Sequence, residues 1–218
     1  SRGSNALTIT NLYGVNYVNS TFVALGRSGS ILTSSDGIAW TDRTTESVNA
    51  TLVGPYHLKE VTYGNGTFVI VGESGTILTS SDGTTWVSRN SDQSFTEEGL
   101  SGVAYGNSTF VAVGNSGTIL TSDNGTTWTS RDSDTDGTFT GVIYVNSIFM
   151  AVSGKTVFTS TDGTTWTDQT SLASEMSTGS LRGITYANGS FVVVGSSGNI
   201  LTSSDGTTWT SRTSGTTS

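Results

Sequence analysis

The segment 132–137 reads DSDTDG, which places carboxylates at alternate positions and ends in glycine. This form is typical of a calcium loop, because oxygen ligands at alternate positions converge on one side of a curled chain and glycine permits the sharp bend. The position where an EF-hand carries its bidentate glutamate is Ile143 here. We therefore expect at most weak calcium binding by Asp132, Asp134 and Asp136, and no other cofactor.

A second group of side chains is able to bind a partner. These side chains lie where the internal repeats of the chain, described below, differ from one another. The group includes basic, acidic, aromatic and imidazole side chains, which can bind a partner through ion pairs, hydrogen bonds and ring contacts. Its members are Tyr13, Arg27, His57, Lys59, Glu60, Glu73 and Arg182. They are spread along the chain, so only the fold can bring them together.

The elements that position these residues follow from an internal repeat. The stretch TILTSSDGTTW at Thr76–Trp86 has near-copies at Ser30–Trp40, Thr118–Trp128, Thr156–Trp166 and Asn199–Trp209. Each copy is preceded by a tyrosine and a phenylalanine at constant spacing. These pairs are Tyr17/Phe22, Tyr63/Phe68, Tyr105/Phe110, Tyr144/Phe149 and Tyr186/Phe191. A period of roughly 40–45 residues with strand-like content indicates a propeller blade.

Each copy predicts four short strands. In the second copy these are Lys59–Tyr63, Thr67–Val71, Ile77–Ser80 and Thr85–Arg89, separated by turn residues such as Asn65-Gly66. A single sheet of this kind cannot bury both of its faces, so five sheets should pack face to face around an axis, with the repeated aromatic residues between them. The sequence therefore predicts an all-β fold, a five-bladed β-propeller with four antiparallel strands per blade.

We expect this propeller to be a closed ring and a single domain over residues 11–218. The blades are predicted at about 11–43, 57–89, 99–131, 138–169 and 180–212. Residues 1–10 form a separate N-terminal segment, which is either a cloning remnant (SRGS) or an edge strand at Ala6–Thr10.

The repeated stretch resembles the Asp-box, or BNR, repeat, whose pattern is Ser/Thr, any, Asp, any, Gly, any, any, Trp. The third copy matches this spacing with Thr121, Asp123, Gly125 and Trp128, whereas the other four copies carry aspartate one position later, at Asp36, Asp82, Asp162 and Asp205. The resemblance covers nearly the whole chain and implies turns stabilised by Ser and Asp. Such repeats occur in sialidases, other glycosidases, sorting receptors, photosystem assembly factors and bacterial surface proteins, so the resemblance implies a fold and leaves the function open.

Propeller topology brings the variable positions to one face. First strands line the central channel, so Lys59, Glu60 and Arg182 should lie near its mouth. Arg27 and Glu73 occupy the turn between the second and third strands, which opens on the same face. Positions that are constant in every copy serve the scaffold, so we expect any ligand to bind the face where the copies differ.

The longest link between blades, residues 44–60, adds to this face. It contains the only proline and the only histidine of the chain, His57, together with Tyr56. Tyr13 occupies the place in the first copy that Lys59 takes in the second. A long loop on a rigid scaffold is where binding groups usually lie.

This arrangement favours a non-catalytic binding propeller that recognises a protein or a glycan. A glycoside hydrolase is one alternative, but it needs a pair of carboxyl groups, and the first strands supply only Glu60, with Glu73 at a turn. A sialidase-like site also needs clustered arginines, and most arginines follow the repeated Trp as part of the scaffold. These are Arg43, Arg89, Arg131 and Arg212. A structural spacer or display domain, or an engineered propeller with consensus-like repeats, is the other alternative.

Composition narrows the partner and the compartment. The net charge of −8 and the pI near 4.4 argue against nucleic-acid binding, which needs a basic face. No apolar run is long enough to insert into a membrane. The absence of cysteine removes disulfides and thiolate metal sites, and the richness in Ser and Thr favours an extracellular or cell-surface location, as part of a larger secreted or phage-tail protein. We expect a monomer.

Overall fold

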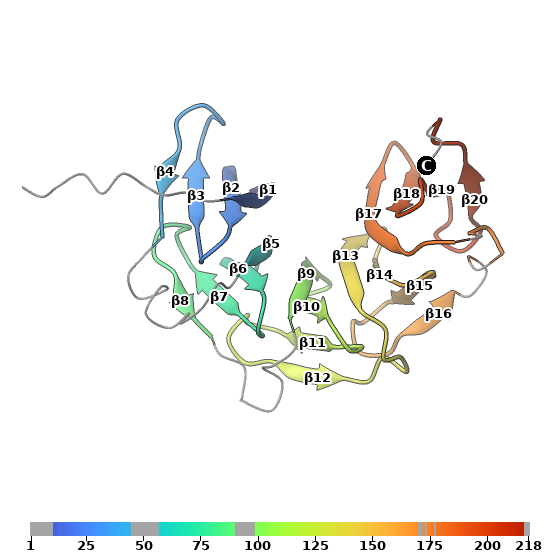
Figure 1. Cartoon of the computed structure of the whole chain (residues 1–218). Helices are drawn as coiled ribbons and strands as arrows, with labels where there is room; N and C mark the ends of the chain where they lie inside the picture. The colour runs from blue at the N-terminus through green and yellow to red at the C-terminus, as the bar shows by residue number, and fades with distance from the viewer. Residues whose placement is uncertain are drawn as a thin grey trace, which may run out of the picture.

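The computed structural model describes residues 11–44, 57–89, 99–169, 172, 174–176 and 178–215. Within these ranges twenty strands form five sheets, each of four antiparallel strands. Figure 1 shows the sheets as blades set side by side along an arc, with the first strand of each blade on the inner side. The all-β fold class and the five four-stranded blades are therefore confirmed. The expected edge strand at Ala6–Thr10, together with Tyr56, lies outside the described residues.

The strands have similar bounds in all five blades. The first blade contains β1 (Leu12–Val18), β2 (Thr21–Gly26), β3 (Ile31–Ser34) and β4 (Thr41–Asp42). The second contains β5 (Leu58–Gly64), β6 (Thr67–Gly72), β7 (Ile77–Ser80) and β8 (Val87–Ser88). The third contains β9 (Leu100–Gly106), β10 (Thr109–Gly114), β11 (Ile119–Ser122) and β12 (Thr129–Arg131). The fourth contains β13 (Phe139–Val145), β14 (Ile148–Ser153), β15 (Thr156–Ser160) and β16 (Thr167–Gln169). The fifth contains β17 (Leu181–Ala187), β18 (Ser190–Gly195), β19 (Ile200–Ser203) and β20 (Thr210–Arg212).

Turn chemistry explains where these strands begin and end. In the second blade Asn65 and Gly66 both have positive φ, at 46° and 74°, which is the backbone of a two-residue hairpin whose twist matches its strands. The fourth strand is shorter than predicted, because the turn before it continues through Trp86 and β8 starts only at Val87. The Trp therefore belongs to the turn and not to the strand.

The turn between the third and fourth strands is held by its own side chains. In the second blade the Ser80 hydroxyl accepts a hydrogen bond from the Gly83 N–H at 2.9 Å and donates one to Asp82 Oδ1 at 2.9 Å. The same Asp82 oxygen accepts the N–H groups of Thr84 and Thr85 at 2.7 and 2.8 Å. Backbone N–H groups that would otherwise be unpaired in a tight turn are thereby satisfied.

The third blade corrects the alignment predicted from its sequence. There Ser122 accepts from the Gly125 N–H at 2.8 Å, and Asn124 Oδ1 accepts from Thr126 N–H at 2.8 Å. Thr121 and Asp123, which match the Asp-box spacing, do not take these roles. The turn requires its acceptor directly before the glycine, so the pattern common to all five copies is Ser, any, Asp or Asn, Gly, any, any, Trp.

These hydrogen bonds lower the pKa of the carboxyl groups in the turns. The backbone N–H groups of Thr85 and Thr84 hold the pKa of Asp82 well below its usual range. The pKa values of Asp36, Asp162 and Asp205 are lowered by equivalent donors. A carboxylate whose ionised form accepts several N–H groups resists protonation.

Adjacent blades pack through a repeated apolar interface. We call the side of a blade that meets the preceding blade its front face, and the opposite side its back face. In the second blade the front face carries Leu58, Val61, Phe68, Ile70, Leu78 and Trp86, and the back face carries Val69, Val71 and Ile77. All of these side chains are buried. The core therefore lies between blades and not within them.

At the two central junctions the tyrosine of an inner strand rests on a glycine of the preceding inner strand, in the pairs Gly64–Tyr105 and Gly106–Tyr144. At the outer junctions Val18 and Tyr63, and likewise Val145 and Tyr186, pack against a shared apolar cluster. A Cβ added to Gly64 would lie 2.0 Å from the ring of Tyr105, so this close approach requires glycine. The inner strands lie closest where the position is glycine, between β5 and β9 and between β9 and β13.

The described residues do not form the expected closed ring. The inner strands contact one another in the order β1, β5, β9, β13, β17, but no comparable packing joins β17 back to β1. Figure 1 shows the first and fifth blades on opposite limbs of an open arc.

No helix in the described ranges is long and apolar enough to cross a membrane.

We expect Gly64→Ala to destabilise the protein by about 1–3 kcal/mol, because the new methyl group must displace the Tyr105 ring in a packed interface. Gly141→Ala is the matched control: an added Cβ there meets nothing within 4 Å, so its free energy of unfolding should change little. Urea denaturation of both variants measures the difference. Equal stability of the two variants would contradict the tyrosine-on-glycine packing.

Stability should also fall in acid because of the turn carboxylates. The folded-state pKa of Asp82 lies below its unfolded value, so its contribution is present at neutral pH and is lost as the pH falls below about 4. Asp82→Asn keeps the acceptor, as Asn124 does in the third blade. Its melting temperature should therefore decline less steeply than that of the unmodified protein between pH 7 and pH 3, whereas Asn124→Asp should steepen the decline. Parallel curves for all three proteins would refute this account.

Candidate functional site

The variable position of each inner strand is a β-bulge. The pairing of first and second strands skips one residue near its start in every blade. The skipped residues are Tyr13, Lys59, Ser101, Thr140 and Arg182. A bulged residue has no partner in the ladder, so its type is free to vary, and bulges commonly re-aim side chains near functional sites.

The bulges and the second turns lie on one face of the arc, as the sequence predicted. The N–H at the tip of the second turn donates to the carbonyl just before the inner strand of the same blade. These bonds are Arg27 to Asn11 at 2.9 Å, Glu73 to His57 at 3.0 Å, Asn115 to Gly99 at 2.9 Å and Ser196 to Ser180 at 2.9 Å. We call this side of the arc the bulge face.

Four predicted residues meet on the bulge face at the junction of the first two blades. The rings of Tyr13 and His57 lie 5.0 Å apart between centroids at 54°. The Lys59 ammonium lies 5.4 Å from the centre of the Tyr13 ring and 2.9 Å from Glu73 Oε1. His57 Nε2 lies 3.8 Å from Glu73 Oε2. We call Tyr13, His57, Lys59 and Glu73 the junction cluster.

Arg27 reaches the junction cluster through its backbone. It forms an isolated β-bridge with His57, which ties the second turn of the first blade to the start of the second blade. The exposed Arg27 therefore stands at the edge of the cluster. The sequence grouped these residues only by face, and the structure places them at one blade junction.

The electrostatics of the junction cluster favour binding over fold stability. The side chains of Lys59 and Glu73 are 34% and 37% exposed, and an ion pair so accessible to water adds only about 0–1 kcal/mol to folding. Tyr13 is 49% exposed, so the ring has a free side. The cluster presents an aromatic surface, a cation and an anion that are held in place but still open to a partner.

Glu60 belongs to the contact between the first two blades. Its carboxylate accepts hydrogen bonds from the Asn16 amide of β1 and from the Val61 N–H at 3.2 Å. Burial raises the pKa of Glu60, and these two donors oppose that effect. The sequence did not single out Asn16, because its place in the other copies holds unrelated residues and nothing marks it as a partner of Glu60.

Arg182 is not part of the junction cluster. It is exposed on β17 in the fifth blade, and the third and fourth blades stand between it and Lys59. Among the described residues it has no hydrogen bond or ion pair with the cluster. Because the arc is open, the bulge face is a row of positions that ends at Arg182 and not a ring of equivalent ones.

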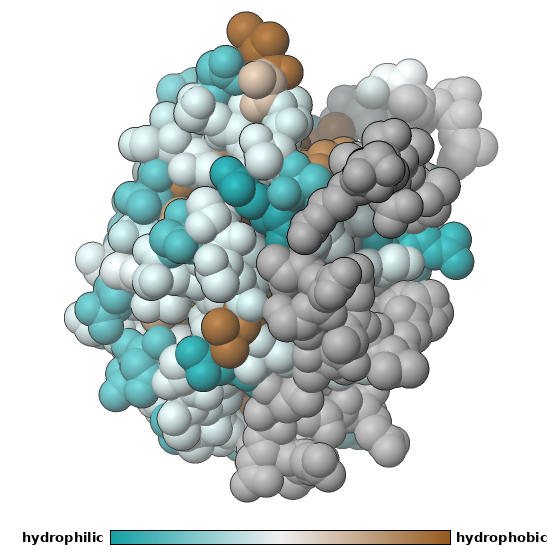
Figure 2. Space-filling view, turned by 90° about the vertical axis from the view of Figure 1, so that its left-hand side faces the viewer, coloured by the Kyte–Doolittle hydropathy of each residue, from teal (hydrophilic) through white to brown (hydrophobic). Residues whose placement is uncertain are grey.

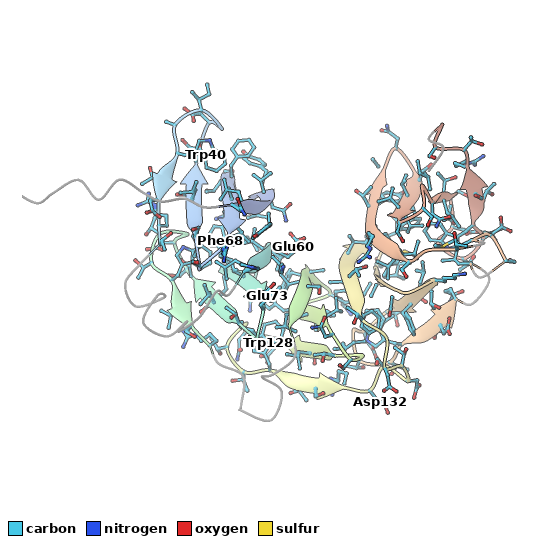
Figure 3. The ribbon with its side chains drawn as sticks, in the orientation of Figure 1. Trp40, Glu60, Phe68, Glu73, Trp128 and Asp132 are labelled. Carbon is cyan, nitrogen blue, oxygen red and sulfur yellow. The ribbon has the colours of Figure 1, made fainter. Side chains whose placement is uncertain are left out.

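The acidic loop does not assemble into a metal centre. Within the described ranges no group of three Asp, Glu, His or Cys side chains could hold a metal ion. Asp132 instead accepts the Asp134 N–H at 3.0 Å, and the Gly137 carbonyl accepts the N–H of Gly117 in the third blade at 2.8 Å. Figure 3 shows Asp132 beyond the end of β12, away from Glu60 and Glu73. The loop, which includes Asp136, therefore links the third and fourth blades.

The opposite side of the arc is uniform. It carries the five Ser-x-Asp/Asn-Gly turns, whose hydrogen bonds repeat in every blade. Four of the five repeated Trp side chains also donate from Nε1 to the glycine carbonyl of their turn, at 3.0–3.2 Å. The side-chain oxygens of the Asp and Asn residues in these turns accept hydrogen bonds from the turn itself, so they stabilise the scaffold.

Comparison with known proteins supports the fold. No protein-family model matches the chain, and no curated protein matches it in sequence. A structure of YCF48 bound to D1 peptide superposes with a TM-score of 0.70 at 20% identity, over 92% of this chain and 68% of that one. The ancestral GH74 enzyme AFV00434 gives 0.67 at 14% identity over 93% and 30%, and the WD40 propeller domain of Doa1 gives 0.65 at 12% over 92% and 70%. The chain thus shares its propeller fold with both binding proteins and an enzyme.

Because the three carboxylates of the acidic loop do not converge, millimolar calcium should leave the melting temperature of the protein unchanged. Differential scanning fluorimetry with calcium and with EDTA measures this. A ligand at one hundred times its dissociation constant would stabilise the fold by about 2.7 kcal/mol. A calcium-dependent rise that Asp134→Ala abolishes would show that the loop binds the ion after all.

Proposed function

We propose that this chain is a non-catalytic binding propeller that recognises a protein partner on its bulge face, with the junction cluster as its centre. The observation that carries the proposal is the assembly of Tyr13, His57, Lys59 and Glu73 around a β-bulge, where the copies of the repeat differ most in charge and shape. The rest of the repeat is constant because it builds the scaffold.

The cluster is organised before a partner arrives. Lys59 is held between the Tyr13 ring and Glu73, so little side-chain freedom remains to be lost on binding. Aromatic and arginine side chains dominate the energetics of protein interfaces, and Tyr13 and Arg27 supply both at one junction. An extended segment that offers a carboxylate to Lys59 and an apolar group to Tyr13 fits this surface.

Binding is favoured over glycoside hydrolysis by the state of the two inner carboxylates. Hydrolysis requires one carboxyl group to donate a proton while a second acts as base or nucleophile on the same bond. Glu60 is bonded to Asn16 and Val61, whereas Glu73 is paired with Lys59 and faces His57. Each carboxylate thus has its own partners, and no acidic pair is directed at a common substrate position.

A protein partner is favoured over a carbohydrate by the similar structures. The YCF48 structure with a comparable fold is described as bound to a peptide. No similar structure cited above is described as bound to a glycan.

We also propose that the Ser-x-Asp/Asn-Gly turns are of the Asp-box type, and that the protein acts outside the cell or at its surface. A display or spacer role would leave the junction cluster without a use.

The test is selection of binders from a random peptide library displayed on phage, with the purified protein as bait. For a selected peptide, Tyr13→Ala and Lys59→Ala should each weaken binding by roughly thirty-fold, the equivalent of about 2 kcal/mol for a hot-spot residue. Arg182→Ala reports whether the peptide extends along the bulge face to the fifth blade. Asp82→Asn, on the opposite side, is the matched control and should leave the affinity unchanged. Isothermal titration calorimetry gives the affinities.

Two outcomes would overturn the proposal. In the first, folded variants of the Ser-x-Asp/Asn-Gly turns bind the selected peptide more weakly, whereas Tyr13→Ala and Lys59→Ala bind it normally. This result would place the site on the opposite face. Selection that yields no binder, together with binding on a glycan array that Lys59→Ala abolishes, would make the bulge face a carbohydrate site.

A further inference from the structure

The front face of the first blade is more exposed than the same face of the other blades. Leu12, Val15 and Trp40 are 47%, 60% and 39% exposed, whereas their equivalents in the second blade, Leu58, Val61 and Trp86, are 0%, 3% and 1% exposed. Tyr17 is 59% exposed. Together with Ala24 and Leu32, Leu12, Val15 and Trp40 line an apolar groove of about 640 Å³. Figure 3 labels Trp40 on this blade, at one end of the arc.

The back face of the fifth blade is exposed in the same way. Val194 is 44% exposed, Ala187 is also exposed, and Val192 and Ile200 are half-buried. The equivalent positions of the second, third and fourth blades are all 0% exposed. They are Val69, Val71 and Ile77, then Val111, Val113 and Ile119, then Met150, Val152 and Val157.

These two surfaces are the complementary halves of one interface. Four times along the chain a front face packs on a back face. At the two central junctions the tyrosine ring lies against the glycine that follows the tyrosine of the preceding blade. By this rule Tyr17 of the first blade matches Ala187 of the fifth. None of the side chains named on either surface is charged, so no like charges face one another in this contact.

Among the described residues, the exposed large hydrophobic side chains belong to the first and fifth blades, apart from Val87 of β8. In Figure 2 the coloured surface on the side of the outer strands of the first two blades is mostly white to teal, with brown in separate spots. A contiguous apolar surface on a protein that is otherwise polar marks an interaction site. In the part of the chain that the structure describes, the two surfaces do not meet within one molecule, because no packing like that between the other inner strands joins β17 to β1.

We propose that the front face of the first blade docks on the back face of the fifth blade of a second copy of this chain. The resulting contact is heterologous, because two different surfaces meet head to tail. Repeated association of copies then either closes into a ring or continues as an open chain. The contact repeats an interface that the chain already forms between its own blades, with the same residue types in the same places. Tyr13 of the junction cluster also lines the groove, whereas His57, Lys59 and Glu73 do not, so the contact borders the proposed peptide site. The proposed contact does not require that a peptide binds there.

Engineered disulfides test the contact directly, because the chain contains no cysteine. The Tyr17→Cys and Ala187→Cys proteins are purified separately, mixed under mild oxidation and separated on a non-reducing gel. We expect a mixed dimer to form at least ten times more abundantly than either homodimer, with peptide mapping placing the bond between positions 17 and 187. The positive control is the Gly64→Cys, Tyr105→Cys double variant, which should form a bond within one chain.

The double variant Tyr17→Cys, Ala187→Cys separates docking from ring closure. Linked oligomers support docking between copies. A monomer with an internal bond would overturn the proposal, because it would show that the arc closes on itself. Absence of any bond at these positions, with the control pair oxidised, would also overturn it.

Sedimentation velocity of the unmodified protein gives a second readout. The weight-average mass should rise with concentration, and the exposed substitutions Val15→Glu and Val194→Glu should each return the protein to a monomer. Val87→Glu, at a 45% exposed position on β8 outside both faces, is the matched control and should leave association intact. Circular dichroism confirms that all three variants are folded. A mass independent of concentration in the unmodified protein would exclude docking between copies.

Discussion

The packing of each front face on the preceding back face is the interaction on which the rest of this structure depends. A blade is one sheet deep, so its two apolar sides can leave water only when blades stand on both sides of it. The side chains of Phe68, Phe110, Phe149 and Phe191 are fully buried at successive junctions. The blades therefore stabilise one another in series, and those at the two ends of the arc each lack one neighbour.

Two parts of each repeat have different roles. The hydrogen-bonded turn stabilises the scaffold, and the β-bulge provides the position that varies. Ser80 and Asp82 close a turn whose backbone has few alternatives, so the same residue types return in each copy. At the other end of the blade, the bulged residue has no partner in the ladder and can change without cost to the sheet. Diversity therefore collects on one side of the arc, which is where the junction cluster lies.

Neighbouring blades make a site that no blade makes alone. Tyr13 comes from the first blade, whereas His57, Lys59 and Glu73 come from the second, and their contacts depend on the packing between the two. Asn16 and Glu60 form a second link across the same junction, by a hydrogen bond between the inner strands of the two blades. The position of the cluster is thus set by the same packing that forms the core.

The sequence by itself determined the five copies, the four strands of each blade and the side on which variation lies, because turn hydrogen bonds and strand alternation are local. Even there it misaligned the third turn, where the acceptor is Asn124 and not Asp123. Only the tertiary structure decided that Lys59 meets Tyr13 and Glu73, that Glu60 pairs with Asn16, that the carboxylates at 132–136 stay apart and that the arc remains open. Each of these depends on the distance and angle between elements far apart in the chain. The close contact of the Tyr105 ring with Gly64 is one example of how this geometry depends on side-chain volume, which repeat patterns do not record.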